Sequence, residues 1–203
     1  YSYNPNGSTA DNFNSLAAGE AETDTVTYTA IDVFGNTITA DILVTINGVN
    51  DAPVLAGDLA GEVDEGATYV ITDTDLGYTD VDDVDAGVTF TAGSLVNGKI
   101  QVNGVDATSF TGTQLTAGQV TFVHDGSETV AASFDVNVED GNEDVSTPVD
   151  QTFNFTVTPT NDAPILTGDL SAAVDEGDTY VITGTDLGYT DVDDVDAGVT
   201  FTA

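Results

Sequence analysis

Cysteine is absent from the sequence, and Lys and Arg together occur once, as Lys99. Without cysteine the chain forms neither disulfides nor thiolate metal sites, and with one histidine it cannot assemble a zinc site. Phosphate backbones and anionic lipid surfaces are recognised through Lys and Arg. Nucleic acid and negatively charged membranes are therefore excluded as partners.

Long apolar stretches are also missing. No run of about 18 apolar residues occurs, and residues 1–6 carry no basic segment of the kind that opens a signal peptide. Any signal or anchor sequence is therefore expected outside these 203 residues. No phosphate-binding loop motif occurs either.

Acidic residues dominate what is present, with 36 Asp and Glu and a formal charge of −35. Two carboxylates about 4 Å apart repel by roughly 4 kcal/mol at an effective dielectric of about 20, so clustered acids call for a cation. Scattered acids have a simpler explanation, because an acidic surface keeps a secreted or halophilic protein soluble. The hydrophobic content of 40% is enough for a core, so the chain is expected to fold despite its charge.

The sequence contains a tandem repeat. Asn50-Asp51-Ala52-Pro53 recurs as Asn161-Asp162-Ala163-Pro164, a period of 111 residues (163 minus 52). Over residues 52–92 and 163–203, 34 of 41 positions are identical without a gap. This period is too long for a solenoid unit of about 20–50 residues and close to the roughly 100 residues of an immunoglobulin-like sandwich. Each period is therefore predicted to be a domain, and Asn-Asp-Ala-Pro the joint, because proline cannot donate to a sheet ladder.

The repeat divides the chain into one complete unit and two partial ones. We assign residues 1–50 to the end of a first β domain, 51–161 to a complete β-sandwich, and 162–203 to the beginning of the next. Residues 24–31 and 37–46 alternate in period two around a turn at Phe34-Gly35-Asn36, which predicts a hairpin. The partial units lack partner strands, so each is expected to expose an apolar face.

The complete unit is predicted to be all-β. Seven short strands are expected, the number of an immunoglobulin-like sandwich, at 54–55, 68–72, 88–91, 99–102, 120–123, 133–138 and 152–158. Asn97-Gly98 and Asn103-Gly104 suit type I′ turns, so residues 95–106 should form a small meander. Residues 113–118 could make a single helical turn.

Several motifs follow one another along this unit: Val63-Asp64-Glu65-Gly66, Leu76 to Asp82, Val120 to Ser127, and Val138 to Gly141. In this order and spacing they resemble the cadherin-like repeats of bacterial adhesins, and also the chondroitin-sulfate-proteoglycan repeat. Ala18-Gly19-Glu20, Asp32 and Ile46-Asn47-Gly48 are similar to the end of a VCBS repeat, a module of giant bacterial surface proteins. The resemblance implies tandem immunoglobulin/cadherin-like β-sandwich domains, one complete and two partial, of a large secreted (RTX-type) adhesin.

The resemblance also implies calcium ligands at the joints. Cadherins hold interdomain calcium with a Glu near the first strand, an Asp-x-Glu in mid-domain, an acidic linker, and an Asp-x-Asp and a later Asp in the next domain. The matching residues of the first joint are Asn50, Asp51, Asp80, Asp82 and Asp140. Those of the second joint are Glu65, Asn161, Asp162, Asp191 and Asp193, and Glu176 stands one period after Glu65.

Two departures from the cadherin pattern matter. No clear mid-domain Asp-x-Glu is found, and Gly48 or Pro159 stands where a fuller linker has another acid. We therefore expect one or two ions per joint, rather than the three typical of cadherins. Independently of any family, calcium takes six to eight oxygens at about 2.3–2.6 Å from such side chains and from loop carbonyls.

Spacing within the acidic run separates candidate ligands from solvated acids. Asp80 and Asp82 are two residues apart and can converge, whereas Asp83 and Asp85 should face solvent. A solvated acidic turn remains the alternative.

Enzymatic readings find little support. His124, Asp125 and Ser127 are sequence neighbours and cannot simply adopt the geometry of a catalytic triad, and carboxylate pairs can be chosen anywhere among so many acids. We therefore expect no enzyme, but a calcium-rigidified structural spacer of an extracellular, secreted or surface-attached bacterial adhesin. Its partners would be calcium and neighbouring repeats, with cell-surface or matrix ligands bound through other domains. A carbohydrate- or protein-binding module, which needs an exposed aromatic cluster, and an accessory domain of a large secreted hydrolase are the alternatives.

Overall fold

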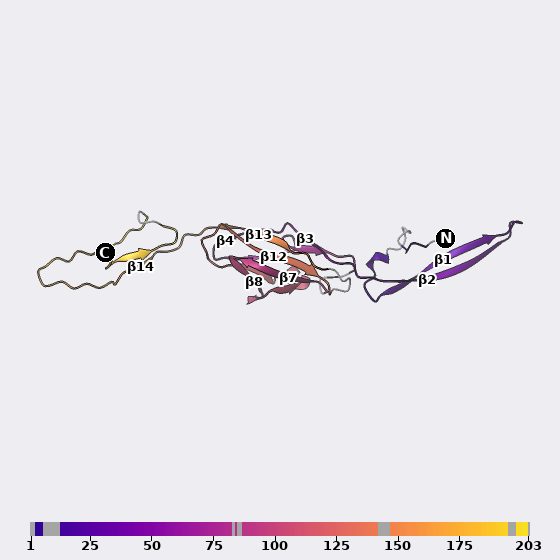
Figure 1. Ribbon diagram of the computed structural model, residues 1–203, viewed down its shortest axis with the longest axis horizontal. Helices are drawn as coiled ribbons and strands as arrows, with labels where there is room; N and C mark the ends of the chain where they lie inside the picture. The colour runs from indigo at the N-terminus through magenta and orange to yellow at the C-terminus, as the bar shows by residue number, and fades with distance from the viewer. Residues whose placement is uncertain are drawn as a thin grey trace.

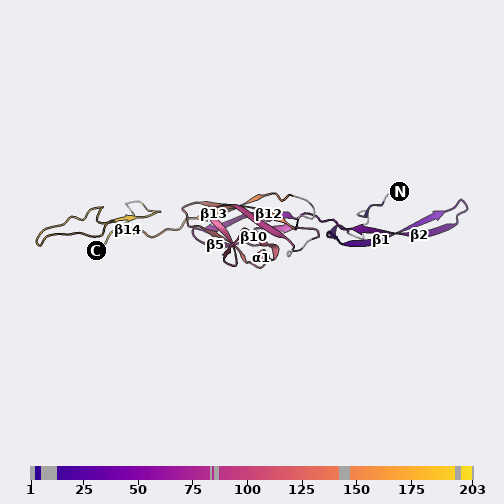
Figure 2. The ribbon, with the colours of Figure 1, turned by 60° about the horizontal axis from the view of Figure 1, so that its bottom comes forward.

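The structure, a computed structural model, describes residues 3–5, 13–82, 84, 87–141, 147–194 and 198–202. An N-terminal hairpin, a central β-sandwich and a C-terminal segment follow one another along one long axis (Figure 1). They keep this order when the molecule is turned about that axis (Figure 2), so the three parts lie in a row. The predicted all-β class is confirmed, because nearly all described elements are strands.

The N-terminal part is the hairpin that its alternating sequence predicts. A 3-10 turn at Phe13–Ser15 precedes strands β1 (Ala21–Ile31) and β2 (Thr37–Asn47), which pair antiparallel along their whole length. Asp32 closes the turn, because its carboxylate accepts the side-chain amide of Asn36 at 2.7 Å and the Asn36 backbone N–H at 2.8 Å. These bonds, the side-chain one first, lower the pKa of Asp32.

The central unit contains two main sheets. One has five strands in the order β10-β7-β12-β13-β4, and the other has four in the order β5-β11-β8-β9. Strands β3 and β6 form a short antiparallel pair, and β13 pairs with β4 in parallel. The bounds are β3 Val54–Ala56, β4 Ala60–Asp64, β5 Thr68–Val70, β6 Gly77–Thr79, β7 Thr89–Val96, β8 Gly98–Val102, β9 Val105–Asp106, β10 Ser109–Thr111, α1 Gly112–Thr116, β11 Val120–His124, β12 Ala131–Glu139 and β13 Gln151–Thr158.

Alternation along the strands builds the core of this unit. Inward positions hold large apolar side chains, and the stacked rings of Phe122 in β11 and Phe155 in β13 join the two sheets with centroids 4.1 Å apart. The inward positions continue past the apolar residues to His124 in β11 and to Asp140 directly after β12, which are 2% and 6% exposed. Each of these strands thus ends by placing a polar group against the core.

Two sequence expectations require correction. All seven predicted strands are present, but the described part of the unit has eleven. Of the four that were not predicted, β6, β9 and β10 have only two or three residues, and the fourth is β4. Residues 95–106 are not one meander. Asn103 and Gly104, with φ of 52° and 79°, do turn β8 into β9, but at Asn97 the chain leaves the five-stranded sheet for the four-stranded one. The predicted helical turn is α1, which Thr111 and Gln114 cap.

The C-terminal segment repeats part of this arrangement. Strands β14 (Ile165–Thr167) and β15 (Gly188–Thr190) pair in the register of β3 and β6 one period earlier. The described residues of this segment form no counterpart of β4 or β5, and Val181 and Ile182 are exposed. In the part of the chain that the structure describes, no helix has the length and hydropathy needed to cross a membrane.

Candidate functional site

The first joint brings together the five residues that the sequence assigned to it. Asn50 is buried and its side-chain amide donates to the Asp140 carboxylate at 2.8 Å and to the Asp51 carbonyl at 3.1 Å. The Asp51 backbone N–H reaches both oxygens of Asp82, at 3.3 and 3.4 Å. Asp80 accepts the Asp82 backbone N–H at 2.9 Å. Linker and central unit are thus joined through carboxylates.

Local structure explains this convergence. Strand β3 begins three residues after Asp51, and β6 ends one residue before Asp80, so their antiparallel pairing places linker and acidic turn side by side. Asp140 arrives from the end of β12 because it continues the inward alternation of that strand. Residues far apart in the sequence therefore meet at one end of the sandwich.

Asp82 shows the electrostatic cost of this arrangement. Desolvation, and then a hydrogen bond to the Asp80 carboxyl, raise the pKa of Asp82 to about 6. Two carboxyls can hydrogen bond to each other only if one of them is protonated, and a cation between them would remove the need for that proton. Among the described residues, no donor reaches the buried Oδ1 of Asp140. The joint thus presents oxygen atoms that a hard cation could bind.

The second joint repeats the local geometry 111 residues later. The Asn161 side chain donates to the Asp162 carbonyl at 2.8 Å, and the Asp162 N–H donates to Asp193 at 2.5 Å. Asp191 accepts the Asp193 N–H at 2.9 Å. The three hydrogen bonds match those of the first joint in donor and acceptor. Asn161, however, is exposed, whereas Asn50 is buried against Asp140.

The end of the central unit that faces the second joint adds its own acids. Glu65, Glu128 and Asp162 form an acidic triad, in which one carboxylate oxygen of each lies within 4.8 Å of those of the other two. The Glu65 carboxylate also accepts the N–H of Thr160 at 3.1 Å, which fixes it to the linker. No described donor reaches its buried Oε1 atom.

The same neighbouring carboxylates make ionisation of Glu128 less favourable. Desolvation, and then a hydrogen bond to Glu65, raise the pKa of Glu128 to about 7, and the charges of Asp193 and Asp162 act in the same direction. The influence of Asp193 connects the acidic triad to the acidic turn of the C-terminal segment. Acids from both sides of the linker therefore act on one another at this joint.

Glu128 was missed by the sequence interpretation. A mid-domain Asp-x-Glu was sought, whereas the acids here are Asp125 and Glu128, with two residues between them. Gly126, with a φ of 79°, and the bond from Ser127 N–H to Asp125 at 3.0 Å shape the turn that presents Glu128. An acid closing a tight glycine turn directly after a strand was the available signal.

The remaining predicted residues lie apart. Glu176 is exposed, and no described contact connects it to either joint. Asp83 and Asp85, which were expected to face solvent, lie outside the described residues.

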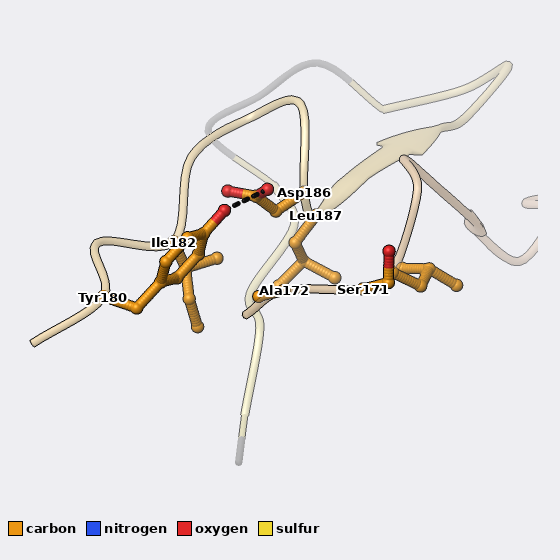
Figure 3. Close-up of a pocket in the computed structure, with 7 residues that line it drawn as sticks. Ser171, Ala172, Tyr180, Ile182, Asp186 and Leu187 are labelled. Atoms are coloured by element: carbon orange, nitrogen blue, oxygen red, sulfur yellow. Dashed lines mark hydrogen bonds between the residues drawn. The ribbon is translucent and has the colours of Figure 1, made fainter. Parts of the chain in front are cut away.

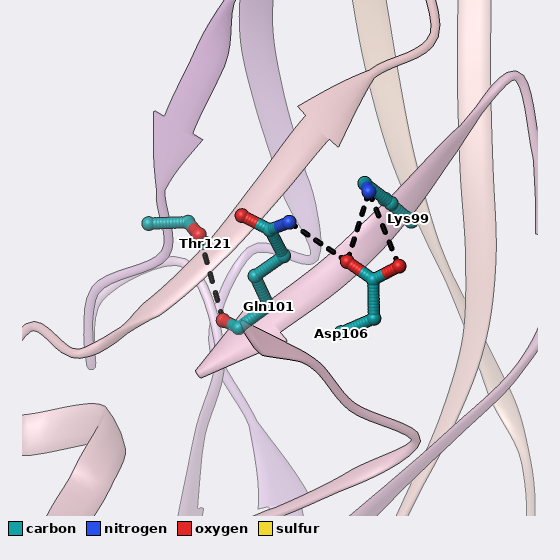
Figure 4. A network of polar contacts seen from close by, with 4 residues as sticks. All are labelled: Lys99, Gln101, Asp106 and Thr121. Carbon is teal, nitrogen blue, oxygen red and sulfur yellow. Dashed lines mark hydrogen bonds and ion pairs between the residues drawn. The ribbon is translucent and has the colours of Figure 1, made fainter. Parts of the chain in front are cut away.

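The one basic residue does not neutralise either joint. Lys99 in β8 pairs with Asp106 in β9 at 2.9 Å, and the side chain of Gln101 donates to the same carboxylate at 2.7 Å (Figure 4). These contacts, Gln101 first, lower the pKa of Asp106. Among the described residues, Lys99 therefore brings no positive charge to either joint.

An apolar depression of about 250 Å³ lies in the C-terminal segment, lined by Leu170, Tyr180, Ile182 and Leu187 among others (Figure 3). Tyr180 donates to Asp186 at 2.6 Å at its edge. One period earlier, Ile71 and Leu76 are buried in the core. The depression is therefore lined mostly by apolar side chains at positions that the first copy buries in its core.

Both joints offer what calcium requires. The donors are carboxylate and amide oxygens in turns, and the buried oxygens of Asp140 and Glu65 without described hydrogen-bond donors are free acceptors. Nitrogen and sulfur ligands are not part of either set, which argues for a hard cation. The donors of both joints therefore fit calcium in chemistry, and among the described residues Glu65, Glu128 and Asp162 are the acids whose carboxylate oxygens lie within 4.8 Å of one another.

Comparison with known families agrees with this architecture. A family model described as cadherin-like matches residues 53–158, just over half of the chain. The match spans strands β3 to β13 together with Glu65, Asp80, Asp82, Glu128 and Asp140. It ends before Asn161 and Asp162 of the second linker.

Proposed function

The chain belongs to the cadherin-like family, and from this premise we propose that it is a structural spacer whose joints are stiffened by calcium. The observation that carries the proposal is the recurrence of three hydrogen bonds at both joints, each built from the linker Asn-Asp and an Asp-x-Asp turn. A shared ion would fix the linker to the domain that follows it. At the second joint, Glu65 and Glu128 would add ligands from the preceding domain.

The arrangement of the three parts suits a spacer. They lie in a row, so stiff joints would add the length of each repeat to the reach of the protein (Figure 1). We propose that it acts in adhesion, secreted or attached to a cell surface, as part of a large bacterial RTX-type adhesin whose binding domains lie elsewhere. We also propose that residues 1–50 end a VCBS-like domain, that 51–161 are one repeat, also similar to the proteoglycan repeat, and that 162–203 begin another.

Calcium would supply the positive charge, while hydrogen bonds within the chain hold the ligand carboxylates in place. Asn50 orients Asp140, the Asp51 N–H holds Asp82, and the Thr160 N–H holds Glu65. The bonds to Asp140 and Glu65 each occupy one carboxylate oxygen and leave the other for the ion. Neutralising these acids removes a repulsion of roughly 4 kcal/mol for each pair about 4 Å apart at an effective dielectric of about 20.

We propose no catalytic role. Ser127 Oγ donates to Asp125 at 2.6 Å, and the two ring nitrogens of His124 face backbone amides and Thr129 instead of Ser127. A carbohydrate-binding surface is also disfavoured, because the phenylalanines of the central unit, such as Phe90 and Phe134, are fully buried. The accessory-domain alternative depends on neighbouring sequence.

Thermal melting tests the proposal. At 100 times its dissociation constant, one ion stabilises the folded state by about 2.7 kcal/mol, which corresponds to roughly 10 °C or more for a domain of this size. We expect chelation to lower the melting temperature by that amount, and Asp80→Ala with Asp82→Ala to remove most of the share of the first joint.

Magnesium at equal ionic strength is the control, because it demands near-octahedral geometry and dehydrates reluctantly. Equal stabilisation by magnesium or sodium chloride would mean that screening of the polyanion explains the effect, and the calcium assignment would be withdrawn.

A further inference from the structure

The single histidine lies between two glycine turns. His124 is the last residue of β11 and is 2% exposed. Its Nδ1 atom accepts the backbone N–H of Gly66 at 3.1 Å and that of Gly126 at 3.2 Å. Its Nε2 atom lies 3.3 Å from Thr129 Oγ1. One imidazole thus contacts three points of the chain.

These contacts define the state of the ring. A nitrogen that accepts two N–H groups carries no proton, so Nδ1 of His124 is unprotonated. Neutral imidazole then carries its proton on Nε2, which donates it to Thr129 Oγ1. Nδ1 of His124 therefore acts as the hydrogen-bond acceptor for both backbone amides.

Each glycine turn carries one member of the acidic triad. Gly66 directly follows Glu65, and Gly126 lies two residues before Glu128. Both glycines have positive φ, 66° and 79°, and a Cβ placed on Gly66 would lie 4.0 Å from the Cα of Gly126. The turns are therefore packed together, and the imidazole bonds to both at once.

Backbone hydrogen bonds also connect His124 to the Gly66 turn. The N–H of His124 donates to the carbonyl of Ala67 at 3.0 Å, and β11 pairs with β5, which follows the Gly66 turn. On the other side, Asp125 accepts both the N–H and the hydroxyl of Ser127, which fixes the turn leading to Glu128. The position of the imidazole thus determines how far apart the two turns lie.

We propose that His124 is a positioning residue for the acidic triad, whose unprotonated Nδ1 holds the Gly66 and Gly126 turns so that Glu65 and Glu128 face the same cation. This inference rests on the proposed calcium function of the second joint. Carboxylates that repel one another in the absence of an ion need support from neighbouring groups, and outer-shell hydrogen bonds of this kind orient metal ligands.

Calcium titration of the full 203-residue chain by NMR tests this role, with the two joints followed separately through the amide signals of Asp82 and Glu128. His124→Leu removes the acceptor and is expected to weaken calcium binding at the second joint by about 10- to 100-fold, as loss of ligand-supporting hydrogen bonds typically does. His124→Asn supplies an acceptor oxygen near Nδ1 and is expected to recover much of the affinity. The first joint is the internal control and should keep its affinity in both variants.

The outcomes separate the inference from the function on which it rests. If wild-type chain binds calcium at the second joint and His124→Leu binds it equally well, the positioning role is overturned and the calcium function stands. If calcium does not saturate either joint of the wild-type chain, the proposed function is overturned, and the inference with it. A selective loss at the second joint, recovered by Asn, supports both.

A second measurement covers the case in which His124→Leu does not fold. Scalar couplings across hydrogen bonds, from His124 Nδ1 to the amide nitrogens of Gly66 and Gly126, can be measured on wild-type chain without calcium. Both couplings, together with the ¹⁵N shift of an unprotonated Nδ1, support the positioning role. Their absence overturns it.

Discussion

Residues 52–92 and 163–202 have nearly the same sequence but bury very different parts of it. Ile71 is fully buried, whereas Ile182, one period later, is 67% exposed. Phe90 is likewise fully buried, and its counterpart Phe201 is 45% exposed. The short antiparallel pair at the joint nevertheless forms in both copies, as β3 with β6 and as β14 with β15.

The difference follows from which partners each strand needs. Strand β4 pairs with β13, and β5 pairs with β11, so both depend on residues 120–158. The β3–β6 pair and the acidic turn after it find all their partners within the repeated stretch. The β3–β6 pair with its acidic turn is therefore a local structure, whereas the sandwich, and the contact of Asn50 with Asp140, are non-local.

Matched substitutions test this contrast most strongly. Ile71→Ala should lower the free energy of unfolding of the central unit by about 2–5 kcal/mol, because it leaves a cavity among Phe and Val side chains. Ile182→Ala, the same change one period later, should alter it by less than about 0.5 kcal/mol, as at other exposed sites. Urea unfolding followed by the near-ultraviolet signal of the central unit measures both.

Completing the second repeat should remove the difference in stability effect between Ile71→Ala and Ile182→Ala. In a chain that continues after Ala203 with residues 93–161, Ile182→Ala should become as costly as Ile71→Ala. A persistent difference there would mean that the seven substitutions between the copies, and not the missing strands, determine burial.

One of those seven substitutions sharpens the comparison. A Cβ on Gly61 would lie 2.8 Å from Cε1 of Phe155, while Ala172 occupies the same position in the second copy. Gly61→Ala should therefore destabilise the central unit by about 1–3 kcal/mol through overpacking of a stacked ring. The reverse change, Ala172→Gly, should have almost no effect in this chain. Equal effects of the two changes in urea unfolding would show that the Phe155 contact is not tight.

The joints differ in their expected response to pH. Desolvation and a neighbouring carboxyl raise the pKa of Asp82 to about 6 and that of Glu128 to about 7, above their ordinary values of 3.8 and 4.5. A carboxyl with a raised pKa stabilises the folded state below its unfolded pKa and loses this contribution as pH rises through the folded value. Calcium-free stability should thus fall between about pH 4 and 7, first at the first joint and then at the second.

Melting at several pH values without calcium measures this loss. Glu128→Gln should remove the part of this stability loss that occurs near pH 7. Saturating calcium should abolish the loss over the whole pH range. Acids with lowered pKa, such as Asp32 and Asp106, lose their contribution at more acidic pH and do not interfere. A stability that stays level or rises from about pH 4 to 7 would contradict the carboxyl pairs at both joints.

The sequence predicted the local features well and the non-local ones less completely. The period and the N-terminal hairpin follow from spacing and alternation, whereas the five residues of the first joint follow from the resemblance to cadherin-like repeats. The structure brings those five together, and their binding of calcium stays a prediction. Glu128 could not be found by a fixed motif, because a glycine turn and the packing of two loops bring it to Glu65. The change of sheet at Asn97 also depends on packing, because its Asn-Gly sequence suits a hairpin turn.

Small-angle scattering of two complete repeats tests the central claim most directly. The chain that continues after Ala203 with residues 93–161 joins two such repeats through the second joint. With calcium its maximum dimension should increase, and the distribution of distances should become that of a rod, because ligands from both sides fix the linker. With chelator, or with magnesium at equal ionic strength, it should become shorter and more variable. The same dimension and domain orientation in all three solutions would contradict the stiffening of the joints by calcium.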